Sequence, residues 1–270
     1  MRDPNKCILC GNCVRACEEL QGIGALGFAF RGTEAMVMPA FDRKISTTDC
    51  VNCGQCRVFC PTGAISIRTN MDEVWEALAD PNVRVVAQVA PAVRVAVGDH
   101  YGLTKGRSVM GKIVNALHLM GFDEVYDTSF SADLTIMEES AEFLDRIKKG
   151  EKLPLLTSCC PAFVNMVRLH YPELAECVST TVSPMCAVSR LIKAKDPEAI
   201  TVFIGPCVAK KSEVADQKIE GNADYVLTYS EIRAMMKAKG VELQPCANDD
   251  QTASTFGKRF ANSGGVTAAV

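Results

Sequence analysis

The chain has 270 residues, of which 48% are hydrophobic, so it can bury a core in one large domain or in a small domain followed by a larger one. Its 29 Lys and Arg residues are balanced by 32 Asp and Glu residues, and the formal net charge of -3 offers no basic excess for nucleic acid. The sequence has no run of about 18 apolar residues for a membrane span and opens MRDPNKCILC, without an apolar leader. We therefore expect a cytoplasmic protein whose thiols are reduced or bound to metal.

Cysteine occurs 14 times, and two blocks near the N-terminus share one spacing, C-x2-C-x2-C-x3-C. They read CILCGNCVRAC at 7–17 and CVNCGQCRVFC at 50–60, and Pro61 follows the second. Three cysteines at this spacing can hold a four-iron cube from one loop, and in two-cluster modules the fourth cysteine binds the other cube. We predict an α+β ferredoxin-like 2[4Fe-4S] module with Cys7, Cys10, Cys13 and Cys60 on one cluster and Cys50, Cys53, Cys56 and Cys17 on the other.

Zinc is the alternative for these blocks. Structural zinc sites usually combine pairs of C-x2-C or include His, and no His lies near the two blocks, so we favour iron-sulfur clusters. Clusters of this class have low potentials and carry one electron each, which makes the module an electron conductor.

Beyond about residue 70, short apolar runs alternate with amphipathic stretches. Strands are predicted at 83–90, 153–158 and 200–207, where branched apolar residues are bounded by Gly or Pro. Helices are predicted at 108–121, at 131–150 with Ser131 as the cap, and from Ser183 with Pro184 as the first helical residue. Alternating strands and helices indicate an α/β domain with a largely parallel sheet. We therefore divide the chain into residues 1–70 and 71–270.

Two later cysteines each stand beside a proline at the end of a predicted strand. Cys160 precedes Pro161 and Cys207 follows Pro206, and ligand sites in parallel α/β sheets gather at the carboxyl ends of strands. Lys210 follows Cys207 and would bring a cation to an anionic metal centre. Each cysteine taken alone can equally be a small buried residue. Cys159 adjoins Cys160, and in an extended segment the two side chains point to opposite faces, which indicates different roles.

These motifs closely resemble those of a known family. TSCCPAF at 157–163 and PCVAKKSE at 206–213, behind a two-cluster module, resemble the catalytic signatures of [FeFe]-hydrogenases. APAVRVAVG at 90–98 and ADLTIMEE at 132–139 are also similar to family segments. The resemblance implies an α/β hydrogenase catalytic domain that reduces protons reversibly to H2, with ferredoxin or another low-potential electron carrier as partner.

The resemblance also implies roles for individual residues around the H-cluster, a [4Fe-4S] cube joined to a two-iron subcluster. Cys160 and Cys207 would bind the cube, and Lys210 would donate a hydrogen bond to a cyanide ligand. Cys159 would pass protons onward through Glu139, Ser179 and Glu142. A relay carboxyl is expected to be buried, with a raised pKa. Without the resemblance, Glu139 and Glu142 would be assigned to a solvated helix face.

The sequence departs from the family pattern in two respects. Phe163, Gly205 and Met185 stand where many members have Trp, Met and Gln, as in the sensory-type branch. The third cysteine motif, E-x3-C-x2-G-C, does not follow, so we expect a catalytic domain that is incomplete at the C-terminus and an H-cluster that forms only if the missing ligands are supplied. Cys177, Cys186 and Cys246 lack the spacing to replace them.

Three other functions remain open from sequence. The chain could be an electron-transfer subunit, a hydrogen-responsive regulator with slow turnover, or an iron-sulfur assembly factor, the last disfavoured because Cys159 and Lys210 are retained. The three histidines are assigned to packing or to the surface; they are His100, His118 and His170.

Overall fold

The computed structural model describes residues 2–100, 102, 106, 108–243 and 253–270. The described chain forms two compact units. Unit 1 contains residues 1–68, 161–175 and 207–212, and unit 2 contains residues 69–160, 176–206 and 213–270. Two short segments from the second half of the chain therefore fold with the N-terminal cysteine blocks.

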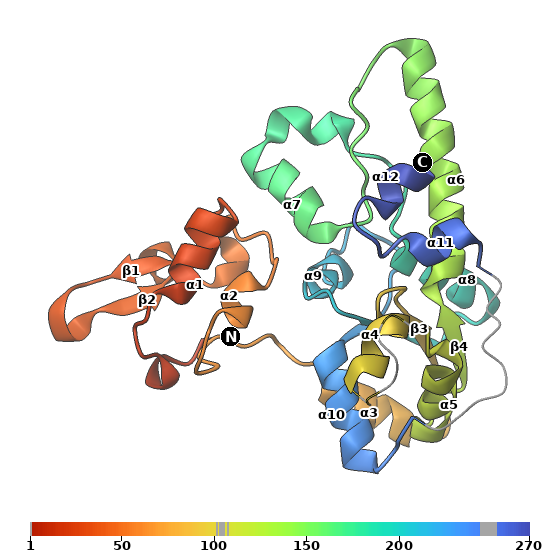
Figure 1. The fold of residues 1–270 in the computed structure, drawn as a ribbon, viewed down its shortest axis with the longest axis horizontal. Helices are drawn as coiled ribbons and strands as arrows, with labels where there is room; N and C mark the ends of the chain where they lie inside the picture. Colours follow the sequence, from red (N-terminus) through yellow and green to blue (C-terminus); the bar gives the residue numbers. More distant parts are fainter. Residues whose placement is uncertain (1, 101, 103–105, 107, 244–252) are drawn as a thin grey trace. The chain divides into compact units, whose positions relative to one another are not determined.

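Unit 1 is built from short elements around two cysteine loops (Figure 1). Strands β1 (Gly27–Ala29) and β2 (Met36–Met38) form an antiparallel hairpin with Phe28 opposite Val37. The predicted ferredoxin-like module is confirmed. The other elements that lie wholly in unit 1 are the α-helices α1 (Asn12–Arg15), α2 (Gln55–Val58) and α7 (Pro161–His170), the π-helical η2 (Ala16–Leu20), and the 3-10 turns η1 (Pro4–Lys6), η3 (Gly32–Glu34), η4 (Ala40–Asp42) and η5 (Ile45–Thr47).

Unit 2 is centred on a four-stranded parallel sheet of order β4-β3-β5-β6. The strands are β3 (Val85–Val89), β4 (Glu124–Asp127), β5 (Ile200–Gly205) and β6 (Tyr225–Thr228). All five residues of β3 are buried, as expected for a central strand with helices on both faces. The predicted α/β class is confirmed, and β3 and β5 match the predicted strands at 83–90 and 200–207.

The two faces of β3 bury different cores because successive side chains point in opposite directions. Val85, Ala87 and Val89 join the larger core with helices α3 (Met71–Ala79), α5 (Met110–Met120) and α10 (Tyr229–Lys239). Val86 packs on the other face against Val188 and Ile192 of helix α8 (Pro184–Lys195). The remaining helices of unit 2 are α4 (Val93–His100), α11 (Thr255–Arg259) and α12 (Gly265–Ala269), whereas η6 (Pro172–Cys177) and α9 (Ala209–Val214) each contribute residues to both units.

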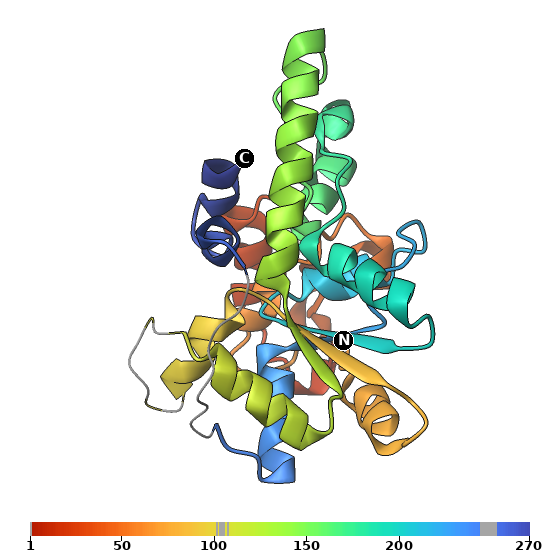
Figure 2. The same cartoon turned by 90° about the vertical axis from the view of Figure 1, so that its right-hand side faces the viewer.

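Helix α6 (Thr128–Lys149) leaves the carboxyl end of β4 and packs along α8 and α11 (Figure 2). Its N-cap is Asp127, whose carboxylate accepts a hydrogen bond from the backbone of Ser129 at 2.8 Å, so the predicted start at Ser131 is wrong. Ser131 lies inside the helix, where its hydroxyl donates to Thr128 O and Pro184 O. Although α6 has 22 residues, no helix of the described chain is both long and apolar enough to cross a bilayer.

The predicted strand at 153–158 is wrong. Leu156 forms only an isolated parallel bridge with Val178, in which Leu156 N donates to Cys177 O and Ser179 N donates to Leu156 O. Pro154 lacks a backbone donor, so the ladder cannot continue toward the N-terminus of the segment. The sequence analysis did not predict β4 and β6, which have four residues each.

Candidate iron-sulfur and proton-transfer sites

The first predicted cluster site is a cavity in unit 1. A space of about 110 Å³ is lined by Cys7, Cys10, Cys13 and Cys60, the four cysteines assigned to one cube. Burial raises the pKa of the Cys13 thiol, and the nearby Cys60 and Cys10 sulfurs raise it further. The donor set therefore fits a [4Fe-4S] cluster, since thiolates are its usual ligands.

The second group of sulfurs is gathered in the same way. Burial raises the pKa of Cys56 to about 12, and the charges of Cys50, Cys53 and Cys17 raise it as well. Cys17, from the first block, thus lies among the sulfurs of the second block, as the crossed ligand pattern requires. Among the described side chains, no three potential ligands approach one another as a single metal ion would require. A four-iron cube is larger and holds its thiolates farther apart.

Both cysteine loops achieve this geometry with the same backbone. We call residues 7–13 the first cysteine loop and residues 50–56 the second. Leu9 and Asn52 have φ of 56° and 60°, and Gly11 and Gly54 have φ of 74° and 76°. Left-handed residues at these equivalent positions curl each loop so that three sulfurs face one centre, and the glycines then begin α1 and α2.

We predict that Cys17→Ser removes the cluster assigned to the second cysteine loop. Iron content should fall by about four per chain, since each cube holds four irons. Cys186→Ser is the matched control, because Cys186 is buried in α8 of unit 2 and should not affect these clusters. Iron analysis together with the electron paramagnetic resonance spectrum of the reduced protein checks this. Retention of both cluster signals in Cys17→Ser would refute the crossed ligand assignment.

The second cysteine set lies at the ends of segments in both units. Cys159 is half-buried, and Cys160 is exposed directly before α7. Cys207 is half-buried and follows β5 after Pro206. Lys210, 8% exposed, lies in the first turn of α9. Cys160 belongs to unit 2, whereas Cys207 and Lys210 belong to unit 1, so their meeting around one cube stays a prediction. Of the proposed substitutes, Cys177 is half-buried, Cys186 is buried, and Cys246 lies outside the described residues.

Unit 2 brings the predicted proton-relay residues together. Glu139 in α6 is fully buried, and its Oε1 accepts a hydrogen bond from the backbone N of Ser158, next to Cys159, at 3.1 Å. The Ser179 hydroxyl donates to Glu142 Oε2 at 2.7 Å and also interacts with Glu139. A hydroxyl that is hydrogen-bonded to one carboxyl group and influences the pKa of the other is suited to pass a proton between them. Within the described residues, Glu139 Oε2 has no hydrogen-bond partner.

The two carboxyl groups have opposite pKa shifts. Burial raises the pKa of Glu139, although the backbone hydrogen bond from Ser158 and the polar side chain of Ser179 partly oppose the shift. Burial acts in the same direction on Glu142 but is outweighed by hydrogen bonds from Ser179, Arg146 and Thr180, which lower the pKa of Glu142. The expected raised pKa is therefore found for the inner carboxyl and is wrong for the outer one. Burial of Glu139 also excludes the alternative of a fully solvated helix face.

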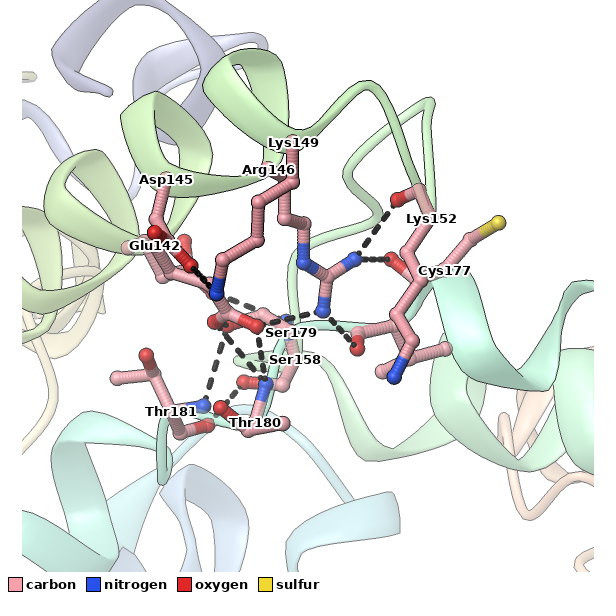
Figure 3. A network of polar contacts seen from close by, with 12 residues as sticks. Glu142, Asp145, Arg146, Lys149, Lys152, Ser158, Cys177, Ser179, Thr180 and Thr181 are labelled. Carbon is pink, nitrogen blue, oxygen red and sulfur yellow. Dashed lines mark hydrogen bonds and ion pairs between the residues drawn. The ribbon is translucent and has the colours of Figure 1, made fainter.

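Arg146 is a residue of this site that the sequence analysis missed (Figure 3). Its side chain is 7% exposed and pairs with Glu142 at 2.5 Å, and it also donates to the backbone oxygens of Lys152, Cys177 and Val178, each at 2.9 Å. The guanidinium thus fixes the outer carboxylate and joins α6 to two backbone segments. The i,i+4 spacing of Glu142 and Arg146 was the available signal.

The pH dependence of stability should differ between the two carboxyl groups. The folded pKa of Glu142 is lowered, so its contribution to stability is present above the ordinary pKa of 4.5 and is lost as pH falls below that value. The folded pKa of Glu139 is raised, so the carboxyl is destabilising as pH rises above 4.5 toward the folded pKa. Urea unfolding over pH should show that Glu142→Gln reduces the loss of stability in acid. Glu139→Gln should flatten the decline above 4.5, and identical profiles in the two variants would contradict this.

One departure from the family pattern has a packing consequence. A Cβ at Gly205 would lie 2.5 Å from Cε1 of Phe203 and 3.3 Å from Cβ of Ala90, so a larger residue requires Phe203 to move. Met185 is 1% exposed in α8, within the larger core of unit 2. Phe163 lies in α7 of unit 1.

Two of the histidines make packing contacts. His118 Nδ1 lies 2.9 Å from Phe122 O, and His170 Nε2 lies 3.0 Å from Asp49 O. The side chain of His100 is outside the described part of the structure. These contacts agree with the assignment of His118 and His170 to packing or the surface.

Paired cysteine loops in one unit and a buried carboxyl-hydroxyl chain beside a parallel sheet in the other define an iron-sulfur protein with a ferredoxin-like module and an α/β domain. Comparisons with known families specify it further. Residues 6–64 match the 4Fe-4S dicluster domain, and residues 83–270 match the C-terminal domain of the iron only hydrogenase large subunit. The chain belongs to the iron-only hydrogenase family. Two [4Fe-4S] clusters and the H-cluster are the cofactors of these domains, as predicted.

Individual relatives agree with this assignment. The chain is 40% identical to NADP-reducing hydrogenase subunit HndD of Solidesulfovibrio fructosivorans, over 93% of this chain and 46% of that protein. It is 33% identical to iron hydrogenase 1 of Clostridium pasteurianum, over 87% and 43%. The apo [FeFe]-hydrogenase HydA1 of Chlamydomonas reinhardtii, in a variant form, superposes with a TM-score of 0.60 at 33% identity, covering 68% of this chain and 52% of that one. The chain thus spans about half the length of these relatives.

Proposed function

We propose that the chain carries out reversible reduction of protons to H2, with electrons delivered through the two [4Fe-4S] clusters. The observation that supports this most directly is a cluster of polar side chains in unit 2. Buried Glu139 accepts a hydrogen bond from the backbone N of Ser158, beside Cys159, and Ser179, which affects the pKa of Glu139, donates to Glu142. An electron carrier without turnover has no use for a buried carboxyl with a raised pKa at this place.

The H-cluster, when bound, supplies the site where protons and electrons combine, and the protein supplies ligands and proton transfer. Cys160 and Cys207 would hold the cube, with Lys210 donating a hydrogen bond to the two-iron subcluster. Cys159 would exchange a proton with that subcluster and with Glu139. Glu139, protonated more readily than an exposed carboxyl, would hold the proton, and Ser179 would pass it to the half-buried Glu142. Arg146 would keep Glu142 oriented toward Ser179.

Ferredoxin or another low-potential carrier would be the electron partner, and the cytoplasm the compartment, because a cysteine-rich chain of this kind needs reduced thiols for cluster assembly. Both are proposals from the cysteine pattern. Labelling of thiols with a membrane-impermeant maleimide in intact cells, compared with lysed cells, would test the compartment.

A different function is indicated by a more distant relative, the cytosolic Fe-S cluster assembly factor NAR1 of Eremothecium gossypii, which is 28% identical over 75% of this chain and 45% of that protein. Hydrogen sensing with slow turnover and electron transfer alone are further alternatives. Electron transfer and cluster assembly do not require a proton relay, so the buried Glu139 beside Ser158 supports proton reduction over these two alternatives.

Iron analysis and infrared spectroscopy on the full chain, prepared anaerobically with a source of the two-iron subcluster, separate these functions. About eight irons per chain correspond to the two clusters of the module, about twelve to an added cube, and about fourteen to a complete H-cluster. Infrared bands of metal-bound CO and cyanide, with H2 release from a reduced viologen, are expected. Full loading of the H-cluster without H2 release indicates a sensor. Eight irons without these bands would overturn the proposal in favour of an electron carrier.

A further inference from the structure

The two cysteine loops have the same backbone but different surroundings. Ile8 and Val51 are equivalent residues in the first and second loops, since each follows the first cysteine of its block. Ile8 is 64% exposed, whereas Val51 is 4% exposed. Cys10 is exposed and its equivalent, Cys53, is half-buried. A repeat with matched geometry thus has one covered loop and one open loop.

The cover of the second cysteine loop comes from other parts of the same unit. A Cβ on Gly54 would lie 2.4 Å from Cγ2 of Val208, so the segment after Cys207 packs directly on this glycine. Asn165 Nδ2 donates to Val51 O at 3.5 Å, and His170 Nε2 lies 3.0 Å from Asp49 O, both from α7. The second loop is therefore fully engaged within unit 1.

The first cysteine loop has an apolar surface at the equivalent place. Leu9 is 42% exposed with a φ of 56°, a backbone conformation for which Asn, the equivalent residue in the second loop, is better suited. Phe28, 54% exposed, lies against Gly11, where its ring atoms are 3.1 and 3.2 Å from the position of a Cβ. Ile8 and Leu9 also line the cavity assigned to the cluster, whereas Phe28 does not. Together the three side chains form an apolar surface beside the cluster site, which favours a surface that is covered in a complex.

The charges around the first cysteine loop favour an acidic partner. Arg15 stands where the second block has Val58, and Lys6, which pairs with Asp3 at 3.4 Å, stands where it has Asp49. Arg15 Nη2 donates to Cys10 O at 3.2 Å and to Asn12 Oδ1 at 2.7 Å, both neutral acceptors, so its positive charge lies beside the exposed cysteine. Residues 1–68 contain eight Lys and Arg and six Asp and Glu, a net charge of +2, within a chain of net charge -3.

We propose that Ile8, Leu9, Phe28 and Arg15 form the docking surface for an acidic, low-potential electron-carrier protein, which delivers one electron at a time to the cluster of Cys7, Cys10, Cys13 and Cys60. The carrier is oxidised by one electron and that cluster is reduced by one. Apolar contacts would exclude water beside Cys10, and Arg15 would steer the acidic carrier to the loop. The inference rests on the proposed function for the direction of electron flow.

Stopped-flow reduction of the full chain, with its clusters assembled, by a pre-reduced acidic [2Fe-2S] ferredoxin tests this surface without requiring H2 turnover. Leu9→Asn introduces the residue that the second loop carries in the same conformation, so it should preserve the fold and the iron content. Leu9→Asn and Arg15→Glu should each lower the second-order rate constant about tenfold, and Arg15→Glu should also weaken its dependence on salt. Val58→Glu, at the equivalent exposed position of the second block, should change the rate less than about twofold.

Dithionite, which needs no docking surface, should reduce the clusters of all variants at one rate. Wild-type rates with the ferredoxin in both Leu9→Asn and Arg15→Glu would overturn the proposal, as would an equal loss in Val58→Glu. Self-association of the wild type that Leu9→Asn abolishes in sedimentation would also overturn it, by assigning the surface to a second copy of the chain. A chain that takes electrons from the ferredoxin but releases no H2 would contradict the proposed function and leave the docking surface intact.

Discussion

Glu139→Gln is expected to abolish most H2 turnover while leaving the metal content unchanged. A buried glutamine is nearly isosteric with a protonated glutamate, so the hydrogen bond from Ser158 N can be kept, but the amide cannot take up and release a proton. General acid-base groups contribute about 10²- to 10⁴-fold, so a loss of at least about 100-fold in H2 release is expected. The measurement is H2 release from reduced viologen, with iron analysis of the same sample.

Glu138→Gln is the matched control for this variant. Glu138 precedes Glu139 in α6 and is exposed, so the substitution makes the same chemical change outside the relay. It should retain wild-type turnover. If Glu139→Gln loses iron, the loss of activity reports on folding, and Glu139→Asp then supplies the test, because a shortened carboxyl should restore part of the turnover. Full activity in Glu139→Gln would rule out this carboxyl as a relay group.

The grouping of the cysteines could be predicted from sequence because the members of each predicted ligand set are nearly all local. Three of the four cysteines in each set come from one loop, and the fourth, Cys17 or Cys60, comes from the other block of the same repeat. The spacing alone thus predicts the proximity of the sulfurs that the cavity and the thiol pKa shifts indicate. The residues that cover the second loop, such as Val208 and His170, lie more than 100 positions away and carry no local signal.

The grouping of Glu139, Ser179 and Glu142 could not be predicted from local sequence patterns. Glu139 and Glu142 are three residues apart on a helix with many charged residues, and the charge pattern alone assigned both to a solvated helix face. Burial of Glu139 depends on the segment around Ser158 and on Ser179, which contact α6 from distant parts of the chain. Only the resemblance to a known family identified the pair in advance. The predicted strand before Cys159 was wrong because an apolar run does not show whether a neighbouring strand is available to pair with it. In this segment the backbone pairs with a neighbour only at Leu156, in a single bridge with Val178.

Arg146→Met is expected to cause a large loss of stability, because Arg146 is a buried residue of α6. Methionine preserves much of the side-chain volume but leaves Glu142 without its cation and three backbone oxygens, those of Lys152, Cys177 and Val178, without their donor. Removing one partner of a buried, hydrogen-bonded ion pair is costly because the remaining polar groups are already desolvated. The free energy of unfolding should fall by about 3 kcal/mol. Urea unfolding followed by the fluorescence of Trp75, which packs against the core of unit 2, measures this change.

Lys149→Met provides the matched control, because Lys149 and Asp145 form an ion pair at 2.6 Å with the same i,i+4 spacing on the same helix (Figure 3). Both of its side chains are more than half exposed, so solvent screens the pair and no measurable change in stability is expected. In Arg146→Met the pKa of Glu142 should also rise, since hydrogen bonding and charge from Arg146 help to lower it. Arg146→Lys keeps the charge but cannot reach all of these acceptors, so it should lie between the wild type and Arg146→Met. Equal stability of Arg146→Met and Lys149→Met would show that the buried guanidinium does not hold α6 to the segments that carry Cys177 and Ser179.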